Sequence, residues 1–271
     1  MAEELTFPSE WATSLEPRLP PSQPGSSIAP TSRPFVTLTF ATSLDSALSL
    51  APGVRTRLSG PASKSMTHYL RSRHDAILIG IGTMLADDPA LNCRLAGAAS
   101  LPRPILVDPT LMWEPRWEDK VLEVQRAGKG LAPYVLCAKQ LDEVPSGHRD
   151  VLEKHGGKFI SCPTSEPGVD GGQRRFSWAD ILQVLHKENL ASVMIEGGGQ
   201  IINSLLHPSN HQLIDSVIVT IAPVWLGRGS VTVSPDRVQD EHGTAVPAAR
   251  LSDVSWHPMG EDVVLCGGLQ G

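Results

Sequence analysis

Residues 74–94 read HDAILIGIGTMLADDPALNCR, and this stretch decides the expected fold. Its apolar run, residues 76–81, is far shorter than a membrane helix and is typical of a strand buried on both faces, the kind that parallel sheets contain. Gly80 and Gly82 stand at its end, where glycine allows a sharp turn and the close approach of a ligand. The stretch therefore predicts a buried strand that ends at a binding edge.

Polar residues continue this stretch beyond the glycines. A turn at residues 83–86 would present backbone N–H groups to an anion, and Asp87 and Asp88 follow it, just before Pro89. We expect a phosphate-binding turn and a pair of carboxylates at one edge of the sheet. A buried strand with a purely structural turn is the alternative, because two glycines alone are a weak fingerprint.

A second stretch, residues 192–206, reads SVMIEGGGQIINSLL. A buried strand at residues 193–195 ends at Glu196, three glycines follow, and residues 200–206 carry apolar side chains at helical spacing. Strand, glycine turn and helix form an arrangement that directs backbone N–H groups at an anion, although a structural turn remains possible here too. Glu196 would lie at the carboxyl end of its strand, facing the same crevice as Asp87.

Strand-like and helix-like segments alternate through the rest of the chain. Expected strands lie at residues 35–40, 104–107, 134–138, 158–161 and 214–221, and expected helices at residues 63–73 and 118–126 and from a capping box at Ser177 and Asp180. Residues 250–257 and 262–266 predict an antiparallel hairpin. We expect one α/β domain, residues 34–271, with a mostly parallel central sheet flanked by helices and an antiparallel C-terminal hairpin.

Composition excludes several classes of protein. An apolar content of 41% is enough for a full core, and no run approaches the roughly 18 apolar residues of a membrane helix. The net charge of −6 argues against a nucleic-acid partner, which requires a basic surface. The cysteines Cys93, Cys137, Cys162 and Cys266 are scattered without a C-x-x-C pair, so we expect buried free thiols and no metal site.

The N-terminal region, residues 1–33, is rich in proline and serine. Such a segment has little apolar surface to offset the entropy cost of ordering, so we expect a flexible extension without a catalytic role, a partner-binding motif being the alternative. Its acidic start lacks the features of a secretory or mitochondrial leader, which predicts a cytoplasmic protein. Residues 163–175, rich in glycine and polar side chains, predict a surface loop.

Four segments together resemble one known family. They are RPFVTLTFATSLD, MTHYLRSRHDAILIGIGTMLADDPALNCR, IEGGGQIINSLL and TIAPVWLG, in that order along residues 33–267. This combination resembles the stand-alone fungal and archaeal reductases of riboflavin biosynthesis, which reduce a ribosylaminopyrimidine 5′-phosphate and are similar to the reductase half of the bacterial bifunctional deaminase-reductase. The resemblance implies a dihydrofolate-reductase-like fold, NADPH as cofactor and a homodimer. The zinc-deaminase pattern, H-x-E with P-C-x-x-C, is missing from the sequence.

The resemblance also implies roles for particular residues. The implied cofactor-binding residues are Thr83, Asp87, Ile160, Gly197, Gly198, Gly199, Gln200 and Ile201. Those implied for the substrate are Asn92, Arg94 and Glu196, with the forked donors of Arg94 suited to a phosphate. The resemblance does not identify the general acid. The chemistry makes Asp87 or Glu196 the candidate catalytic group that delivers a proton to the opening ribose ring, provided that the site raises its pKa.

Three alternatives remain open at this point. A reductase of the same fold acting on another heterocycle, such as a pterin, would share these features. A non-catalytic NADPH-binding protein would keep the glycine turns, and Pro61 and Ala62 stand where an acidic residue is common in the family. A conventional Rossmann dehydrogenase fits less well, because the glycine-rich turn comes late and no acid follows about 20 residues on.

Overall fold

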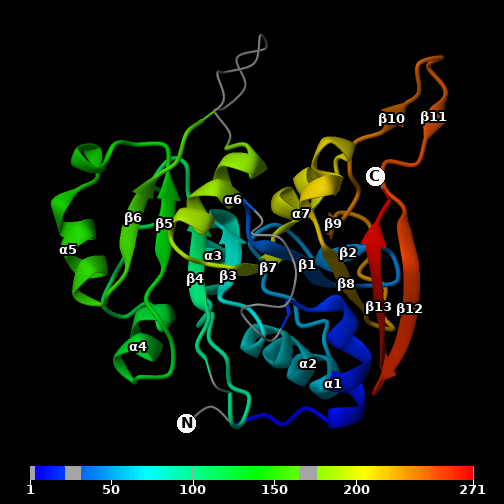
Figure 1. The fold of residues 1–271 in the computed structure, drawn as a ribbon, viewed down its shortest axis with the longest axis horizontal. Coiled ribbons are helices and arrows are strands. Elements are labelled where there is room, and N and C mark those ends of the chain that lie inside the picture. The colour runs from blue at the N-terminus through cyan, green and yellow to red at the C-terminus, as the bar shows by residue number, and fades with distance from the viewer. Residues whose placement is uncertain (1–3, 22–31, 99, 165–175, 271) are drawn as a thin grey trace.

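The computed structural model describes residues 4–21, 32–98, 100–164 and 176–270. Within these residues the centre is a nine-stranded sheet in the order β12-β13-β8-β1-β7-β3-β4-β5-β6 (Figure 1). The strands from β8 to β6 run parallel, and β13 and β12 extend the sheet antiparallel at one edge. The expected mostly parallel α/β sheet with an antiparallel C-terminal hairpin is confirmed.

The main sheet is formed by β1 Phe35–Thr42, β3 Ala76–Gly80, β4 Arg103–Val107, β5 Tyr134–Cys137, β6 Lys158–Ser161, β7 Ser192–Gly197, β8 Ser216–Ile221, β12 Leu251–Met259 and β13 Asp262–Leu269. Two small ladders pair β2 Ala47–Ser49 with β9 Val231–Thr232, and β10 Val238–Gln239 with β11 Ala245–Val246. The helices are α1 Ser9–Leu15, α2 Pro61–Ser72, α3 Ile81–Asp87, α4 Lys120–Arg126, α5 Ser146–Lys154, α6 Trp178–Lys187 and α7 Gly199–Leu205, with short 3-10 turns η1 Glu16–Arg18, η2 Leu141–Glu143 and η3 Pro208–Leu213.

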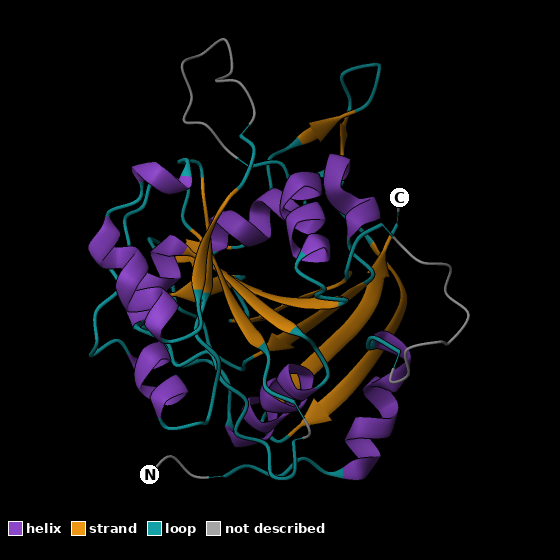
Figure 2. Cartoon of the chain, turned by 60° about the vertical axis from the view of Figure 1, so that its left-hand side comes forward, coloured by secondary structure: helices purple, strands orange, loops and turns teal. Residues whose placement is uncertain are grey.

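Helices cover both faces of the sheet (Figure 2). One face packs against α6 and α7 in a cluster that includes Leu38, Leu78 and Leu185. The opposite face is covered in two parts: α3, α4 and α5 pack around Leu106, and α1 and α2 pack around Met194. Strands β3 and β7 are therefore buried from both sides, as their continuous apolar runs predict.

Local signals explain where several elements begin. Ser177 caps α6, and its hydroxyl oxygen accepts a 3.0 Å hydrogen bond from the N–H of Asp180, so the predicted helix start is confirmed. The Asp180 carboxylate accepts from the Ser177 hydroxyl and not from its backbone N–H, so the full capping box is not formed. The turn expected at residues 83–86 is wrong: the chain enters α3 directly from Gly80, because Met84 is buried against the sheet on the first helical turn.

The flexible extension expected at residues 1–33 is also wrong for residues 4–21, which carry α1 and η1. Leu15 and Leu19 are buried, at 0% and 5% exposure, in the cluster beneath α2. These two leucines pack against apolar residues of α2 and the sheet. The helix is therefore stabilised by tertiary packing and not by its intrinsic helix propensity. Residues 22–31 and most of the expected surface loop at residues 163–175 lie outside the described residues.

Candidate active site

The glycine turn after β7 lies against the start of α3. The N–H of Gly198 donates a 3.1 Å hydrogen bond to the Thr83 hydroxyl oxygen. A methyl group on Gly198 would come within 3.0 Å of that oxygen, and one on Gly80 within 3.0 Å of Ile201. Gly197 has a φ of +107°, which other residues rarely adopt. The two predicted turns therefore form one closely packed unit that leaves no room for side chains at these positions.

Thr83 and Asp87 stand four residues apart on α3 and so share one face of the helix. Asp87 is partly exposed at the last helical position. Its neighbour Asp88 is held by Lys120, whose backbone N–H donates a 3.1 Å bond to one carboxylate oxygen while its ammonium lies 3.2 Å from the other. The two adjacent acids therefore have different roles. Asp88 holds the start of α4, and Asp87 lies at the edge of the site.

The other predicted cofactor residues are spread more widely. Gln200 is exposed on the first turn of α7, and Ile201 packs against Gly80. Ile160 lies on β6, at the far edge of the sheet. Four strand spacings separate β6 from β7, roughly 19 Å in all, so Ile160 is not brought to the glycine turn.

Glu196 is bound by Arg71 of α2. The guanidinium donates two hydrogen bonds to the carboxylate, 2.7 Å from Nε and 2.6 Å from Nη2, and both side chains are less than one-fifth exposed. Glu196 also lines a cleft of about 180 Å³ whose remaining walls are Thr39, Phe40, Ala41, Ser59, Thr67 and Thr220. Asp87 is not among these residues, so the expected sharing of one crevice by the two carboxylates is not seen in this cleft.

Asn92 and Arg94 lie beside α2. The Asn92 side chain donates a 3.2 Å hydrogen bond to the carbonyl of Lys129, and the backbone carbonyl of Asn92 accepts a 2.9 Å hydrogen bond from Arg71. The backbone N–H of Arg94 donates to Nδ1 of His68 at 3.1 Å, and its guanidinium lies 2.9 Å from Nε2 of the same ring. Within the described part of the chain, Arg94 forms no ion pair with a carboxylate.

His68 is almost fully buried among cations. Burial, followed by the charges of Arg71, Arg94 and Lys64, lowers the pKa of His68 to about 3. The ring is therefore neutral at physiological pH and offers one acceptor nitrogen, whereas Arg94 presents donors to both nitrogens. The neutral ring can accept at only one of these two nitrogens, so His68 satisfies the donors of Arg94 only in part.

Lys64, His68 and Arg71 form a polar stripe on α2, and the sequence predictions named neither His68 nor Arg71 as site residues. Their spacing of four and then three residues puts them on one helical face. The signal was present, because Met66 and Leu70 occupy the opposite, apolar face. The stripe can be recognised as part of a site only in the folded structure, where Arg94 and Glu196 lie beside it.

Two other features lie outside this site. Asp45, just after β1, accepts hydrogen bonds from Ser43 and from the N–H groups of Leu226 and Gly227, and these bonds lower the pKa of Asp45 to about 2. A hollow of about 320 Å³ between the end of α3 and residues 112–119 contains none of the predicted site residues.

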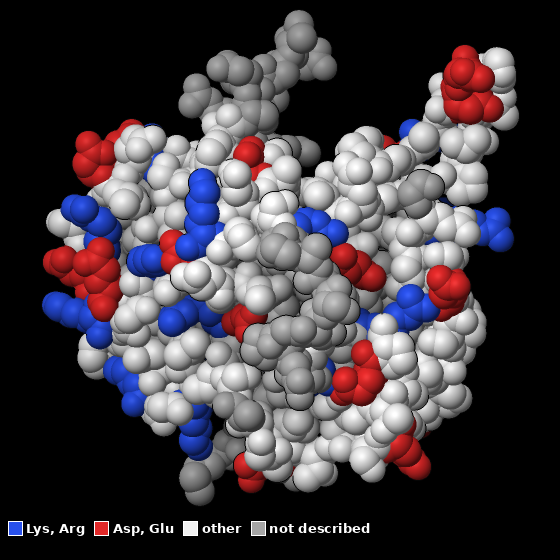
Figure 3. All heavy atoms as spheres, in the orientation of Figure 1, with Lys and Arg blue, Asp and Glu red and all other residues white. Residues whose placement is uncertain are grey.

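Other expectations can be compared with the described residues. All four cysteines are buried and unpaired, as predicted. No group of His, Cys, Asp or Glu among the described residues is arranged to hold a metal ion. On the face shown in Figure 3, basic and acidic side chains are interspersed. In the parts of the chain that are described, no helix has the length and apolar character needed to cross a membrane.

A parallel sheet with a glycine turn and a polar cleft at its carboxyl edge defines an α/β ligand-binding protein, here of dihydrofolate-reductase-like fold. The chain belongs to the RibD C-terminal domain family, whose model matches residues 34–265.

Similar proteins are found among yeasts. The chain is 43% identical over 243 residues to the 2,5-diamino-6-ribosylamino-4(3H)-pyrimidinone 5′-phosphate reductase of Debaryomyces hansenii, covering 88% of this chain and 90% of that protein. It is 37% identical over 240 residues to the Saccharomyces cerevisiae reductase of the same name, covering 87% of each. The solved structure of the Saccharomyces cerevisiae riboflavin biosynthesis reductase Rib7 matches with a TM-score of 0.75 and 33% identity, over 96% of this chain and 100% of that one.

Proposed function

We propose that this protein catalyses the NADPH-dependent reduction of 2,5-diamino-6-ribosylamino-4(3H)-pyrimidinone 5′-phosphate to its ribitylamino form, an early step of riboflavin biosynthesis. The yeast relatives are named for this substrate. The observation that carries the proposal is the cationic group of Lys64, Arg71 and Arg94 around a neutral His68, next to the cleft lined by Glu196. It provides a place for a phosphate beside a place for a polar sugar.

The ribose ring opens first, and the reduction follows at C1′. The bond between C1′ and the ring oxygen breaks, the lone pair of the amino nitrogen forms a C=N bond, and the ring oxygen takes a proton. A hydride then adds to C1′ and the electron pair returns to nitrogen, which leaves an open ribityl chain. Bound NADPH would supply that hydride. The protein must hold C1′ in position, deliver the proton and exclude water.

The glycine turn fits a dinucleotide. Gly197, Gly198 and Gly199 have no side chains to block a pyrophosphate, and this turn lies at the carboxyl edge of the sheet. The Thr83 hydroxyl accepts a bond from Gly198 and so retains its own hydrogen to donate to a phosphate oxygen. Gln200 and Ile201 continue this surface, and Ile160 would contact only a distant part of the cofactor.

Arg94 and Glu196 are assigned to the substrate. The guanidinium of Arg94, which forms no ion pair with a carboxylate within the described residues, would bind the 5′-phosphate, with its backbone fixed beside Asn92. Because both oxygens of Glu196 are bonded to Arg71, proton delivery by Glu196 would first require weakening this pair. Asp87 is the less constrained candidate for that step.

The same proposal includes a cytoplasmic homodimer. Trp225 and Trp256 are 71% and 59% exposed, and large exposed aromatic side chains are common at interfaces between proteins. Sedimentation of the purified protein would measure its oligomeric state, and a monomer at micromolar concentration would contradict this part.

The test is loss of NADPH absorbance in the presence of the purified protein and the ribosylaminopyrimidine 5′-phosphate. We expect oxidation that requires both the 5′-phosphate and the ribosylamine. Oxidation with dihydrofolate instead would favour a pterin reductase. Tight NADPH binding without turnover of either compound would favour a non-catalytic role. NADH in place of NADPH tests the cofactor preference.

A further inference from the structure

The N-terminal residues 5–20, here called the N-terminal strap, contact the substrate side of the site although they lie outside the residues that the family model matches. The N–H of Leu5 donates a 2.8 Å hydrogen bond to the carbonyl of Arg94, and the N–H of Ala96 donates a 2.8 Å bond to the carbonyl of Leu5. These two bonds form a parallel bridge between Leu5 and Leu95. The backbone that carries Arg94 is thus paired with the strap.

The same backbone is held from the other side by α2. The N–H of Arg94 is bonded to His68, and the carbonyl of Asn92 accepts from Arg71. Both backbone groups of Arg94 are therefore engaged, one by α2 and one by the strap. The orientation of the Arg94 side chain depends on both partners.

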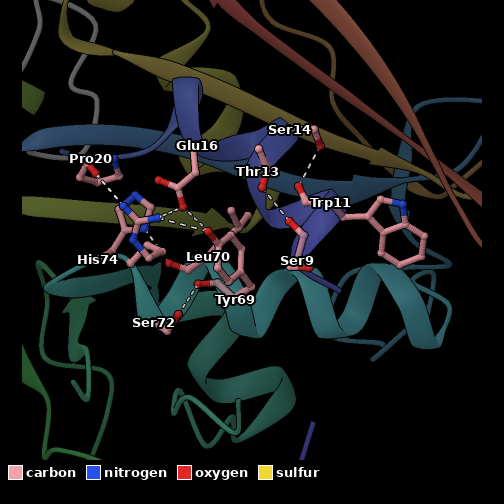
Figure 4. A network of polar contacts seen from close by, with 11 residues as sticks. Ser9, Trp11, Thr13, Ser14, Glu16, Pro20, Tyr69, Leu70, Ser72 and His74 are labelled. Carbon is pink, nitrogen blue, oxygen red and sulfur yellow. Dashed lines mark hydrogen bonds and ion pairs between the residues drawn. The ribbon is translucent and has the colours of Figure 1, made fainter. Parts of the chain in front are cut away.

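The strap also grips the face of α2 that points away from the polar stripe. Tyr69 and Arg73 both donate hydrogen bonds to the Glu16 carboxylate, and Arg73 donates a 3.1 Å bond to the carbonyl of Pro20 (Figure 4). Phe7 stacks on Tyr69 with ring centroids 4.9 Å apart. Burial, and the bond to Glu16, raise the pKa of Tyr69, which therefore stays protonated and able to donate.

Apolar packing also holds the strap against α2 and the sheet. Leu15 and Leu19 are buried with Met66 and Leu70 of α2, and with Ile218 of the sheet. The guanidinium of Arg18 donates to the carbonyl of Asp253 on β12. The strap is therefore anchored to the sheet at one end and bonded to Arg94 at the other.

We propose that the N-terminal strap is a positioning element for the substrate phosphate: it holds the Arg94 backbone against α2, so that the guanidinium stays where the phosphate binds. This inference rests on the proposed function. It predicts that the strap affects substrate binding more than NADPH binding or the chemical step.

The test compares Leu5→Pro with Leu5→Ala in the full chain. Proline removes the N–H that bonds to Arg94, whereas alanine keeps it and serves as the matched control. We expect Leu5→Pro to raise the KM for the ribosylaminopyrimidine phosphate by about three- to tenfold, with kcat and the KM for NADPH within about twofold of the unsubstituted protein. Leu5→Ala should resemble the unsubstituted protein. Equal losses in kcat and both KM values, or no change in the substrate KM, would overturn the positioning role.

A second measurement does not depend on turnover or on a variant that must fold. Amide hydrogen exchange of Leu5 and Ala96 is followed in the unsubstituted protein with and without ribose 5-phosphate. Slower exchange at these amides with the sugar phosphate supports the strap, and unchanged exchange at saturating sugar phosphate contradicts it. Absence of turnover in the unsubstituted protein would instead count against the proposed function, so the two failures are distinguishable.

Discussion

Arg94 has no carboxylate partner within the described residues, whereas Arg71 is neutralised by Glu196. A guanidinium in contact with a neutral histidine keeps most of its charge available for a ligand. Its planar fork can bind a phosphate through two parallel hydrogen bonds, which a lysine ammonium cannot reproduce.

Replacement of Arg94 by lysine should therefore weaken substrate binding. We expect Arg94→Lys to raise the KM for the 5′-phosphate substrate by about 10- to 100-fold, the effect of losing a charged hydrogen bond. The KM for NADPH should stay unchanged. Steady-state kinetics measure both values, and Arg116→Lys, at a side chain that is 70% exposed, is the matched control. An equal rise in both KM values would move Arg94 out of the substrate site.

Asp87 and Asp88 offer a comparison between adjacent carboxylates. If Asp87 delivers the proton to the ring oxygen, Asp87→Asn should lower kcat by about 100-fold or more, the usual contribution of a general acid. NADPH binding, measured by fluorescence titration, should change much less. Asp88→Asn is the control, because Asp88 is bonded to Lys120. Equal losses in turnover and NADPH affinity after Asp87→Asn would assign Asp87 to the cofactor.

At the scale of the elements, the N-terminal helix depends on burial. Leu15 is fully buried between α2 and the sheet, so Leu15→Ala should lower the free energy of unfolding by about 2–5 kcal/mol. Urea unfolding measures this change. Leu141→Ala, at a side chain that is 47% exposed, should change stability by no more than about 0.5 kcal/mol. A similarly small effect at Leu15 would mean that α1 contributes little to the fold.

The sequence predicted those elements whose signals are local. Continuous apolar runs identified β3 and β7 as buried parallel strands, and the cap at Ser177 located the start of α6. Helix α1 was not predicted because the proline-rich composition of residues 1–33 indicated a flexible segment. Leu15 and Leu19 stabilise it only by packing against α2 and the sheet, which are distant in the sequence. A helix of seven residues has little stability of its own, so no local sequence pattern predicts it.

Only part of the candidate site could be predicted from the sequence, as was the case for the fold. The glycine turn and Glu196 follow from strand ends, and Arg94 followed from the family resemblance. The pairing of Glu196 with Arg71 and of Arg94 with His68 could not be predicted, because each pair joins residues 26 or 125 positions apart. Such contacts arise only when α2 is packed across the sheet.

At the scale of the whole molecule, the burial of two histidines should affect how the stability of the protein depends on pH. His68 and His74 are 4% and 2% exposed, and burial is the main cause that lowers their pKa values to about 3 and about 4. Burial keeps the His74 ring neutral, and its two nitrogens contact the carbonyl of Leu70 and the Thr37 hydroxyl, each at 2.7 Å. His68 is part of α2 and His74 follows its C-terminal end, so protonation of these rings would disturb the helix that carries the polar stripe.

The sign of the pH effect follows from these shifts. An unfolded histidine takes up its proton near pH 6.5, whereas folded His68 does so only near pH 3, so between these values the unfolded chain binds more protons. The free energy of unfolding should fall as pH drops below 6.5, by up to about 1.4 kcal/mol per pH unit for each buried histidine. Urea unfolding at several pH values from 6.5 to 5 measures the slope. His68→Gln should reduce that slope, and His186→Gln, at an exposed position, should leave it unchanged. An unaltered slope in His68→Gln would show that the His68 ring gains its proton as readily in the folded protein as in the unfolded chain.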